Sequence, residues 1–309
     1  MKVMGNWFKL TLLLGAMTAL IVWIGNYFGG QQGMILAFIL AIGMNFFSFW
    51  FSDRIVLRMY RAREVGPGEH RELYDMIRQL SQSAHLPMPR VYIIPEQAPN
   101  AFATGRNPDH AVIAVTEGLL RTMGREELMG VLAHEMAHVK NRDILIGSIA
   151  ATMAGAIMIL AGMARWAVFL GGRSDDEGDG ASSAIGLIVM SILAPLAAML
   201  IQMAISRSRE YQADTTGAGF AGNPEGLANA LEKLGAYSKR IPMQANPSTA
   251  HMFIVNPLSA RSLTHMFSTH PPLEQRIARL RGTEAKISVE SREDRGKSAA
   301  EATWRNLSK

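Results

Sequence analysis

The sequence contains no cysteine among its 309 residues. Without thiols, a disulfide framework, a thiolate metal site and a cysteine nucleophile are all excluded. Any bound metal ion would therefore need histidine, aspartate or glutamate ligands. Charged residues are also scarce, at 18% of the chain beside 49% hydrophobic residues, whereas soluble domains carry about 25% charged residues. Because the apolar residues are concentrated in blocks, the composition indicates a membrane protein.

The first of these blocks lacks charged residues from Leu10 to Ser52. Gly29-Gly-Gln-Gln-Gly33 interrupts it near the middle, and each half is long enough to cross about 30 Å of hydrocarbon. A cleaved signal peptide is the alternative for the first half. No clear small-residue cleavage site follows that half, however, and a second apolar run begins at once. The sequence therefore predicts a transmembrane hairpin in residues 1–53.

A second pair of uncharged runs covers 144–164 and 180–206, with Pro195 as a tolerated kink. The acidic, glycine-rich stretch 171–180 separates the two runs. A buried hairpin of a soluble core is the alternative, but runs of this length favour membrane helices. Basic residues flank the outer ends of both hairpins: Lys2, Lys9, Arg54, Arg58, Arg61, Arg63, Lys140, Arg142, Arg207 and Arg209. The positive-inside rule therefore places both termini in the cytoplasm, and it explains the net charge of +5 better than nucleic-acid binding does.

The remaining segments have the patterns of a water-exposed domain. We expect helices over 69–84, 223–237 and 271–280, short strands over 91–94 and 111–115, and a turn-rich connection over 100–108. The predicted fold is mainly α with a small β-sheet, with four transmembrane helices and a cytoplasmic catalytic domain built from two sequence segments. The expected division is 1–53 first hairpin, 54–143 first catalytic segment, 144–206 second hairpin, 207–282 second catalytic segment and 283–309 disordered tail.

The most distinctive pattern is His134-Glu-Met-Ala-His138. On a helix, residues four apart lie on nearly the same face, so both imidazoles can reach one metal ion. Glu135 lies about 100° round the helix from His134, beside the metal, where it can hold a water molecule. This geometry is typical of zinc hydrolases, although the pattern alone also arises by chance. Since two ligands do not complete a site, a third has to come from elsewhere in the chain.

A second pattern, Glu210-Tyr-Gln-Ala-Asp214, follows the second hairpin. Two histidines, one glutamate and a water molecule are a common catalytic zinc arrangement, which makes Glu210 the expected third ligand. Asp214 would then accept a hydrogen bond from a ligand imidazole. A solvated acidic pair beside the arginines is the alternative, and spacing alone does not decide between the two. Topology favours the metal site, because two spans between His138 and Glu210 return the chain to the same side of the membrane.

Taken together, these motifs resemble the HtpX family of membrane zinc endopeptidases, with the CAAX prenyl endopeptidase as a more distant relative. The resemblance rests on the two motifs above, the two spans between them and Asn100-Ala-Phe-Ala-Thr-Gly105 upstream. It extends from the first hairpin to about Leu280. It implies a zincin-like (gluzincin) catalytic domain in the bacterial inner membrane, one zinc ion per chain, and a role in quality control of misfolded or damaged proteins.

The resemblance also implies individual roles. His134, His138 and Glu210 would be the zinc ligands and Glu135 the general base. Asn100 would contribute to the substrate cleft, beside an edge strand expected at Ala111, Val112, Ile113, Ala114 and Val115 that pairs with an extended substrate. His270 and Arg276 would lie near the site as donors to the oxyanion, although a histidine before two prolines is equally expected as a turn or helix-cap residue.

Three other functions remain to be weighed. A transporter is disfavoured because the predicted spans carry no ionisable side chain. A non-catalytic scaffold or chaperone would be expected to have lost Glu135 or a ligand, and none is missing. A CAAX-type processing protease stays open, but that relative has more spans than four. Arg295-Gly-Lys-Ser298 lacks the upstream glycine of a phosphate-binding loop, so no ATP is expected. The expected partners are unfolded or membrane proteins and the lipid bilayer.

Overall fold

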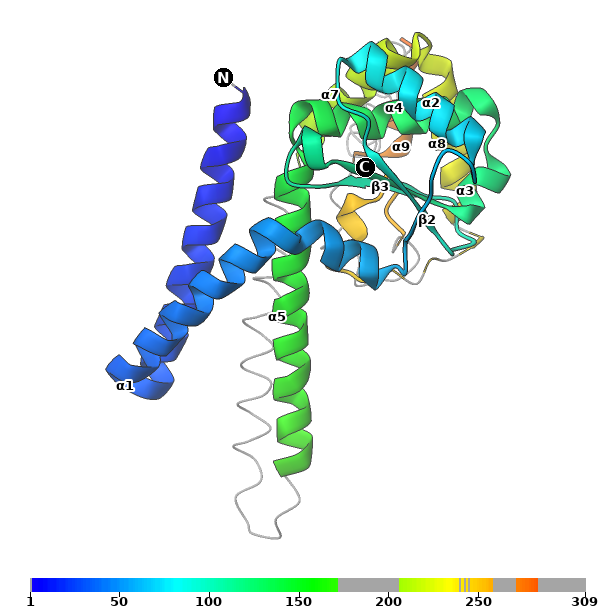
Figure 1. The fold of residues 1–309 in the computed structure, drawn as a ribbon. Coiled ribbons are helices and arrows are strands. Elements are labelled where there is room, and N and C mark those ends of the chain that lie inside the picture. The colour runs from blue at the N-terminus through cyan, green and yellow to red at the C-terminus, as the bar shows by residue number, and fades with distance from the viewer. Residues whose placement is uncertain are drawn as a thin grey trace, which may run out of the picture.

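The computed structural model describes residues 2–171, 206–238, 240–241, 243, 245–257 and 271–282. Figure 1 shows two long helical arms, α1 and α5, joined to a domain of helices and strands. Several predictions lie outside the described residues: the fourth membrane span, most of the acidic loop 171–180, the tail 283–309 and the position of His270.

The first helix, α1 (Lys2–Met59), is broken at Gly30, whose φ of 56° and ψ of −146° are not helical. Glycine adopts a positive φ without the steric penalty of a Cβ atom, so the chain can reverse there. The two halves of α1 approach so closely that a Cβ on Gly25 would lie 2.5 Å from the carbonyl oxygen of Gly33. The predicted interruption at 29–33 is therefore confirmed, and α1 folds back on itself (Figure 1).

Within the described residues, one helix is long and apolar enough to cross a membrane. It is the second half of α1, Gly29–Met59, and only 17% of its most apolar window is buried. Shorter apolar helices occur at Leu10–Trp23 and at Ile144–Met158, the first part of α5 (Ile144–Gly171). The four-span arrangement thus stays a prediction, with one clear span among the residues that can be described.

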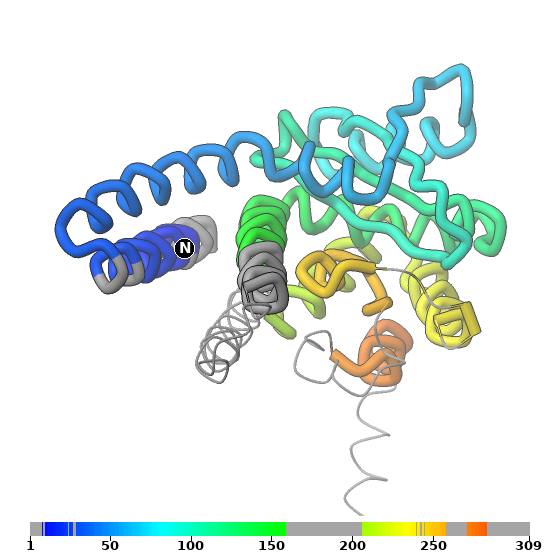
Figure 2. The backbone as a smooth tube through the Cα atoms, turned by 90° about the horizontal axis from the view of Figure 1, so that it is seen from below, coloured from blue at the N-terminus to red at the C-terminus, as the bar shows by residue number. Residues whose placement is uncertain are grey.

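Helices α1 and α5 pack together through a buried apolar cluster. Leu13 and Met17 of α1 contribute to it together with Ile149 and Met153 of α5. Seen from below in Figure 2, α5 lies between the first half of α1 and the domain, while the second half of α1 runs past α5 into the domain. The segments expected to form separate hairpins therefore share one core.

The domain contains a four-stranded mixed sheet in the order β1-β2-β4-β3. Its strands are β1 (Arg63–Glu64), β2 (Arg90–Ile94), β3 (Ala101–Thr104) and β4 (Val112–Thr116). Strand β2 runs parallel to β4, while β1–β2 and β3–β4 are antiparallel. The fold is mainly helical with a small sheet, as predicted.

Two predictions about this sheet are wrong. Residues 101–104, expected inside a turn-rich connection, form strand β3, which pairs with β4. The run is only four residues long and lies between the turn-forming residues Asn100 and Gly105, so its sequence does not stand out as a strand. Residues 111–115, expected as an edge strand, overlap the central strand β4, which is hydrogen-bonded to β2 on one side and β3 on the other. A continuous run of buried apolar residues is typical of such an interior strand, so the substrate-facing edge cannot be there.

The helices predicted for the domain are confirmed and share one apolar core with the sheet. They are α2 (Arg71–Ala84), α4 (Arg125–Asn141), α8 (Pro224–Ser238) and α9 (Leu273–Leu280), joined by α3 (Glu117–Thr122), α7 (Arg207–Ala221) and the short 3₁₀ turns η1 (Pro108–His110) and η2 (Ala250–Met252). The main core joins α2, α4 and α8 to the sheet through residues such as Ile77, Val131, Leu231 and Ile113. Helix α4 therefore lies at the centre of the domain (Figure 1).

Glycines let two helices approach the backbone of α4. A Cβ on Gly217 of α7 would lie 2.8 Å from the backbone nitrogen of His134, and a Cβ on Gly130 would lie 2.4 Å from the backbone nitrogen of Leu227 in α8. Side chains other than hydrogen do not fit at such separations. The two sequence segments of the domain are thus held together with α4 between α7 and α8.

We expect Gly217→Ala to destabilise the protein, because the added methyl group meets the α4 backbone rather than a movable side chain. Overpacking of this kind costs about 1–3 kcal/mol. Gly219→Ala is the matched control on the same helix: nothing lies within 4 Å of its added Cβ, and better helix propensity should leave stability equal or about 0.5–1 kcal/mol higher. Thermal unfolding of the detergent-purified variants measures both. Equal melting temperatures for the two variants would contradict the close approach.

Candidate metal centre

Helix α4 carries the first two side chains of the site. Its first turn is fixed by the Gly124 backbone N–H, which donates to Glu127 Oε2 at 2.8 Å, and it ends where Arg142 adopts a left-handed φ of 59°. His134 and His138 lie one turn apart on the buried face, with ring centroids 4.8 Å apart and ring planes at 90°. The helix expected from the sequence therefore presents both imidazoles to the same point.

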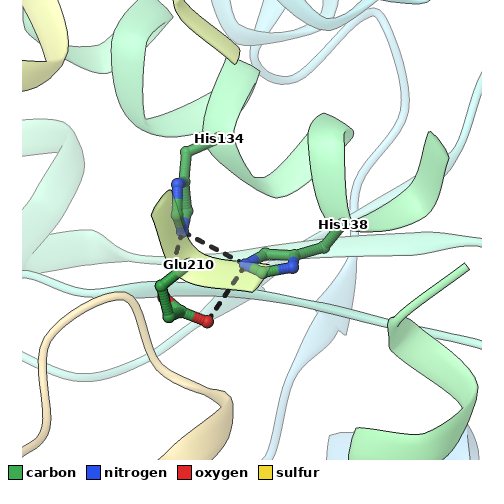
Figure 3. Close-up of side chains that lie close together, drawn as sticks. All are labelled: His134, His138 and Glu210. Atoms are coloured by element: carbon green, nitrogen blue, oxygen red, sulfur yellow. Dashed lines mark hydrogen bonds and ion pairs between the residues drawn. The ribbon is translucent and has the colours of Figure 1, made fainter. Parts of the chain in front are cut away.

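Glu210, in the first turn of α7, completes the cluster (Figure 3). The Nε2 atoms of the two histidines are 3.2 Å apart. Glu210 Oε2 lies 3.8 Å from His134 Nε2, and Oε1 lies 3.6 Å from His138 Nε2. With metal–ligand bonds of roughly 2.1 Å, tetrahedral geometry separates ligand atoms by about 3.4 Å. The donor set and its spacing therefore fit a zinc ion.

Behind His134 lies a buried ion pair. His134 Nδ1 is 3.0 Å from Asp214 Oδ1, and Arg276 of α9 donates to both oxygens of Asp214, from Nε at 2.9 Å and from Nη2 at 2.7 Å. Burial alone would raise the pKa of Asp214, but the Arg276 charge and these hydrogen bonds lower it to about 2. Burial lowers the pKa of His134 to about 4.

His138 has an equivalent partner that sequence reasoning did not assign. Asp143 Oδ2 lies 3.3 Å from His138 Nδ1. Burial opposes protonation of His138, but the hydrogen bond to Asp143 and the charge of Glu210 outweigh it and raise the pKa to about 9. The sequence hint to this contact is that Asp143 lies just after the end of the helix that carries His138. Spacing could not reveal it, because the contact depends on the left-handed turn at Arg142.

Glu135 lies at the base of a pocket between the two sequence segments. Ala103 of β3, Ile144 and Gly147 of α5, and residues 252–254 contribute its other walls. Burial raises the pKa of the Glu135 carboxyl to about 7, while a backbone hydrogen bond from Ala103 acts in the opposite direction. A carboxyl group with this pKa can accept and release a proton near neutral pH.

Two further predicted residues, Asn100 and Arg276, each donate to a backbone carbonyl in residues 254–255, next to the wall of this pocket. Asn100 is buried and donates from Nδ2 to the Val255 carbonyl at 2.8 Å, which fastens residues 253–255 beside β3. Arg276 is fully buried and is not among the residues that line the pocket. Its Nη1 donates to the Ile254 carbonyl at 3.1 Å and lies 3.9 Å from Glu210 Oε2. Its Nε and Nη2 donate to Asp214, and Nη2 also lies 3.4 Å from both ring nitrogens of His134. This position differs from the one expected of an oxyanion donor.

A histidine pair and an adjacent glutamate on one helix, joined by a carboxylate from a second helix, define the class of metal-dependent hydrolase sites. Within that class, the chain belongs to peptidase family M48, whose model matches residues 67–284. It is 67% identical over 279 residues to the "Protease HtpX homolog" of Desulfatibacillum aliphaticivorans, covering 90% of each chain. It is 64% identical over 280 residues to the protein of that name in Syntrophobacter fumaroxidans, covering 90% of this chain and 99% of the relative.

A solved structure shares the fold. The crystal structure of S. mikatae Ste24p matches with a TM-score of 0.50 and 17% sequence identity, over 90% of this chain and 66% of that chain. At this identity the match concerns the fold alone. The family expected from the two motifs is confirmed by the family model and the close relatives.

We expect Glu210→Ala to lower the metal content of the purified protein, because it removes one of three ligand side chains from a buried cluster. Glu117→Ala, which removes an exposed glutamate from the first turn of α3, is the matched control and should retain the wild-type content. Elemental analysis of metal per chain after dialysis makes the comparison. A Glu210→Ala protein with full zinc content would identify a different third ligand.

Proposed function

We propose that this protein is an integral-membrane zinc endopeptidase that hydrolyses peptide bonds of misfolded or damaged proteins at the cytoplasmic membrane surface. The observation that carries the proposal is the convergence of His134, His138 and Glu210, which line one pocket together with Glu135. Membership of peptidase family M48 supports peptide-bond hydrolysis as the reaction.

His134, His138 and Glu210 would hold one zinc ion per chain. When bound, zinc polarises the scissile carbonyl and lowers the pKa of a coordinated water molecule. Glu135 takes the proton from the attacking water on a carboxyl oxygen and later passes it to the leaving amine. Asp214 holds Nδ1 of His134, so that Nε2 keeps its lone pair directed at the metal position.

Arg276 acts through Asp214 in this scheme. Its guanidinium is fully buried and paired with that carboxylate, so it positions the ligand shell rather than contacting the substrate. His270, expected as a donor to the oxyanion, keeps that role as part of the proposal.

The substrate strand is assigned to β3 in place of the residues first expected. Strand β3 is at the edge of the sheet, and Ala103 both lines the pocket and donates to Glu135. The Ala101 carbonyl already accepts a hydrogen bond from Ile254 N at 3.1 Å. An extended peptide would therefore add along β3 beside Ala103, where backbone hydrogen bonds read little side-chain identity. Asn100 supports this arrangement by fixing Val255.

The membrane location follows from the apolar helices. The second half of α1 exposes large apolar side chains such as Phe38, Leu40 and Phe47, which water would not favour. Ile144 and Gly147, in the first turn of α5, line the pocket, so the reaction would take place next to the third proposed span. We infer four spans in the bacterial inner membrane, both termini and the site in the cytoplasm, and substrates that are membrane proteins or unfolded segments near the bilayer.

A CAAX-type processing protease is the second candidate within the same chemistry, and the fold shared with Ste24p does not decide between the two candidates. A non-catalytic scaffold is disfavoured because Glu135 and all three metal-binding side chains are present and converge. Cleavage of casein, which carries no prenyl group, would favour the broad endopeptidase over the processing enzyme.

We expect Glu135→Gln to bind zinc normally and to lose casein proteolysis by two orders of magnitude or more (about 10²–10⁴-fold), because glutamine keeps the size of the side chain but cannot accept the proton. The assay measures casein cleavage and zinc content on the same detergent-purified sample. Glu117→Gln is the control. A Glu135→Gln protein that cleaves at the wild-type rate would disprove the role given to this carboxylate.

Removing the metal should abolish proteolysis without unfolding the domain, because buried apolar side chains join α2, α4, α8 and the sheet. We expect dialysis against a chelator to eliminate casein cleavage, and one equivalent of zinc to restore it. Circular dichroism of the treated protein should retain its helical signal. Full activity in metal-free protein, verified by elemental analysis, would exclude a metallopeptidase.

A further inference from the structure

The two histidines of the site are held from behind in the same way. His134 contacts Asp214, which is paired with Arg276, and this arrangement is sealed in the core with Arg276 0% and Asp214 2% exposed. His138 contacts Asp143, and the other oxygen of Asp143 lies 3.6 Å from Arg209 Nη1. Each imidazole thus has an aspartate behind Nδ1, and each aspartate has an arginine.

The second arrangement is built by local backbone geometry. Arg142 has a left-handed φ of 59°, and the Asp143 backbone N–H donates to the His138 carbonyl at 3.0 Å. This turn brings the Asp143 side chain back to Nδ1 of His138. Arg209 approaches from α7, one residue before Glu210, so the pair joins the end of α4 to the start of α7.

The two arrangements differ in their surroundings. Asp143 and Arg209 keep 10% and 13% of their side chains exposed, and both line the pocket. Asp143 directly precedes α5, and its carbonyl accepts from Gly147 N at 3.3 Å, in the first turn of that helix. The support of His138 therefore lies where α4, α5 and α7 meet, while the support of His134 lies in the core.

We propose that Asp143 and Arg209 are positioning residues that hold His138 as a metal ligand. The inference rests on the proposed function, since it assigns two further residues to the same metal site. Asp143 accepts the Nδ1 proton of His138, which leaves the Nε2 lone pair for the metal and fixes the ring plane. Arg209 acts through Asp143, by holding the second carboxylate oxygen. Because Asp143 directly precedes α5, the orientation of His138 depends on the position of the start of the third proposed span.

The variants separate this role from a structural one. Asp143→Asn keeps the size of the side chain and its suitability before a helix, but loses the carboxylate. Arg209→Met removes the charge while keeping an unbranched apolar side chain. Arg207→Met is the matched control: Arg207 is exposed in the same helical turn, so the same net charge is lost away from the site.

The first measurement is zinc affinity of the full-length, detergent-purified protein, by competition with a chromophoric chelator. Loss of a hydrogen-bond partner of a ligand histidine lowers metal affinity about 10–100-fold, which is the expected result for Asp143→Asn. Arg209→Met should lower it less, and the double variant should be no weaker than Asp143→Asn, because Arg209 acts through Asp143. Arg207→Met should match the wild type.

The second measurement is the visible absorption spectrum of the cobalt(II)-loaded protein, which reports ligand geometry and does not depend on turnover. We expect altered band positions in Asp143→Asn, wild-type bands in Arg207→Met, and partial return to wild type in Asp143→Glu. Unchanged affinity and spectrum in Asp143→Asn, or purely additive effects in the double variant, would overturn the inference. If the wild type itself binds no zinc, the proposed function fails; if it binds zinc and the variants equal it, only this inference fails.

Discussion

The close approach of α4 and α7 is the constraint on which the rest of the site depends. The two histidines come from one sequence segment and Glu210 from another, so residues that are distant in the sequence have to be brought together by folding. Gly217 permits the approach, because the α4 backbone at His134 lies where its Cβ would be. Once the helices are this close, residues one turn apart on α4 and at the start of α7 are directed at a common point. The metal cluster is thus a consequence of helix packing.

This packing also buries charge, and buried charge has to be paired. Glu210, Asp214 and Arg276 all lie in the interior of the domain. Removing a carboxylate and a guanidinium from water costs several kcal/mol per ion, which is offset only by good mutual geometry and complete hydrogen bonding. The two-point contact between Arg276 and Asp214 supplies that geometry. Helix α9, the last element described, is therefore tied to the centre of the site by electrostatics as well as by apolar contacts.

Much of the architecture could be predicted because it is encoded in local patterns. The helices carrying His134, Pro224 and Leu280 follow from apolar periodicity and helix-start signals. The break near Gly30 could be predicted from the glycines at positions 29, 30 and 33. Strand β3 was missed because Ala101 to Thr104 is a short run between turn-forming residues, and its strand conformation comes from pairing with β4. Residues 111–115 were expected at the sheet edge for the same reason. The order of strands is a property of the whole sheet and cannot be predicted from the sequence of a single strand.

By itself, the sequence determined the donor types, the helical spacing of each motif and the family, because each depends on residue identity and on separations of three or four positions. Only the tertiary structure decided which strand borders the pocket, that Arg276 pairs with Asp214 and does not line the pocket, and that Asp143 contacts Nδ1 of His138. Those three facts depend on how segments distant in the chain are brought together. Side-chain chemistry is local, whereas the direction in which a buried side chain points is fixed by the elements packed around it.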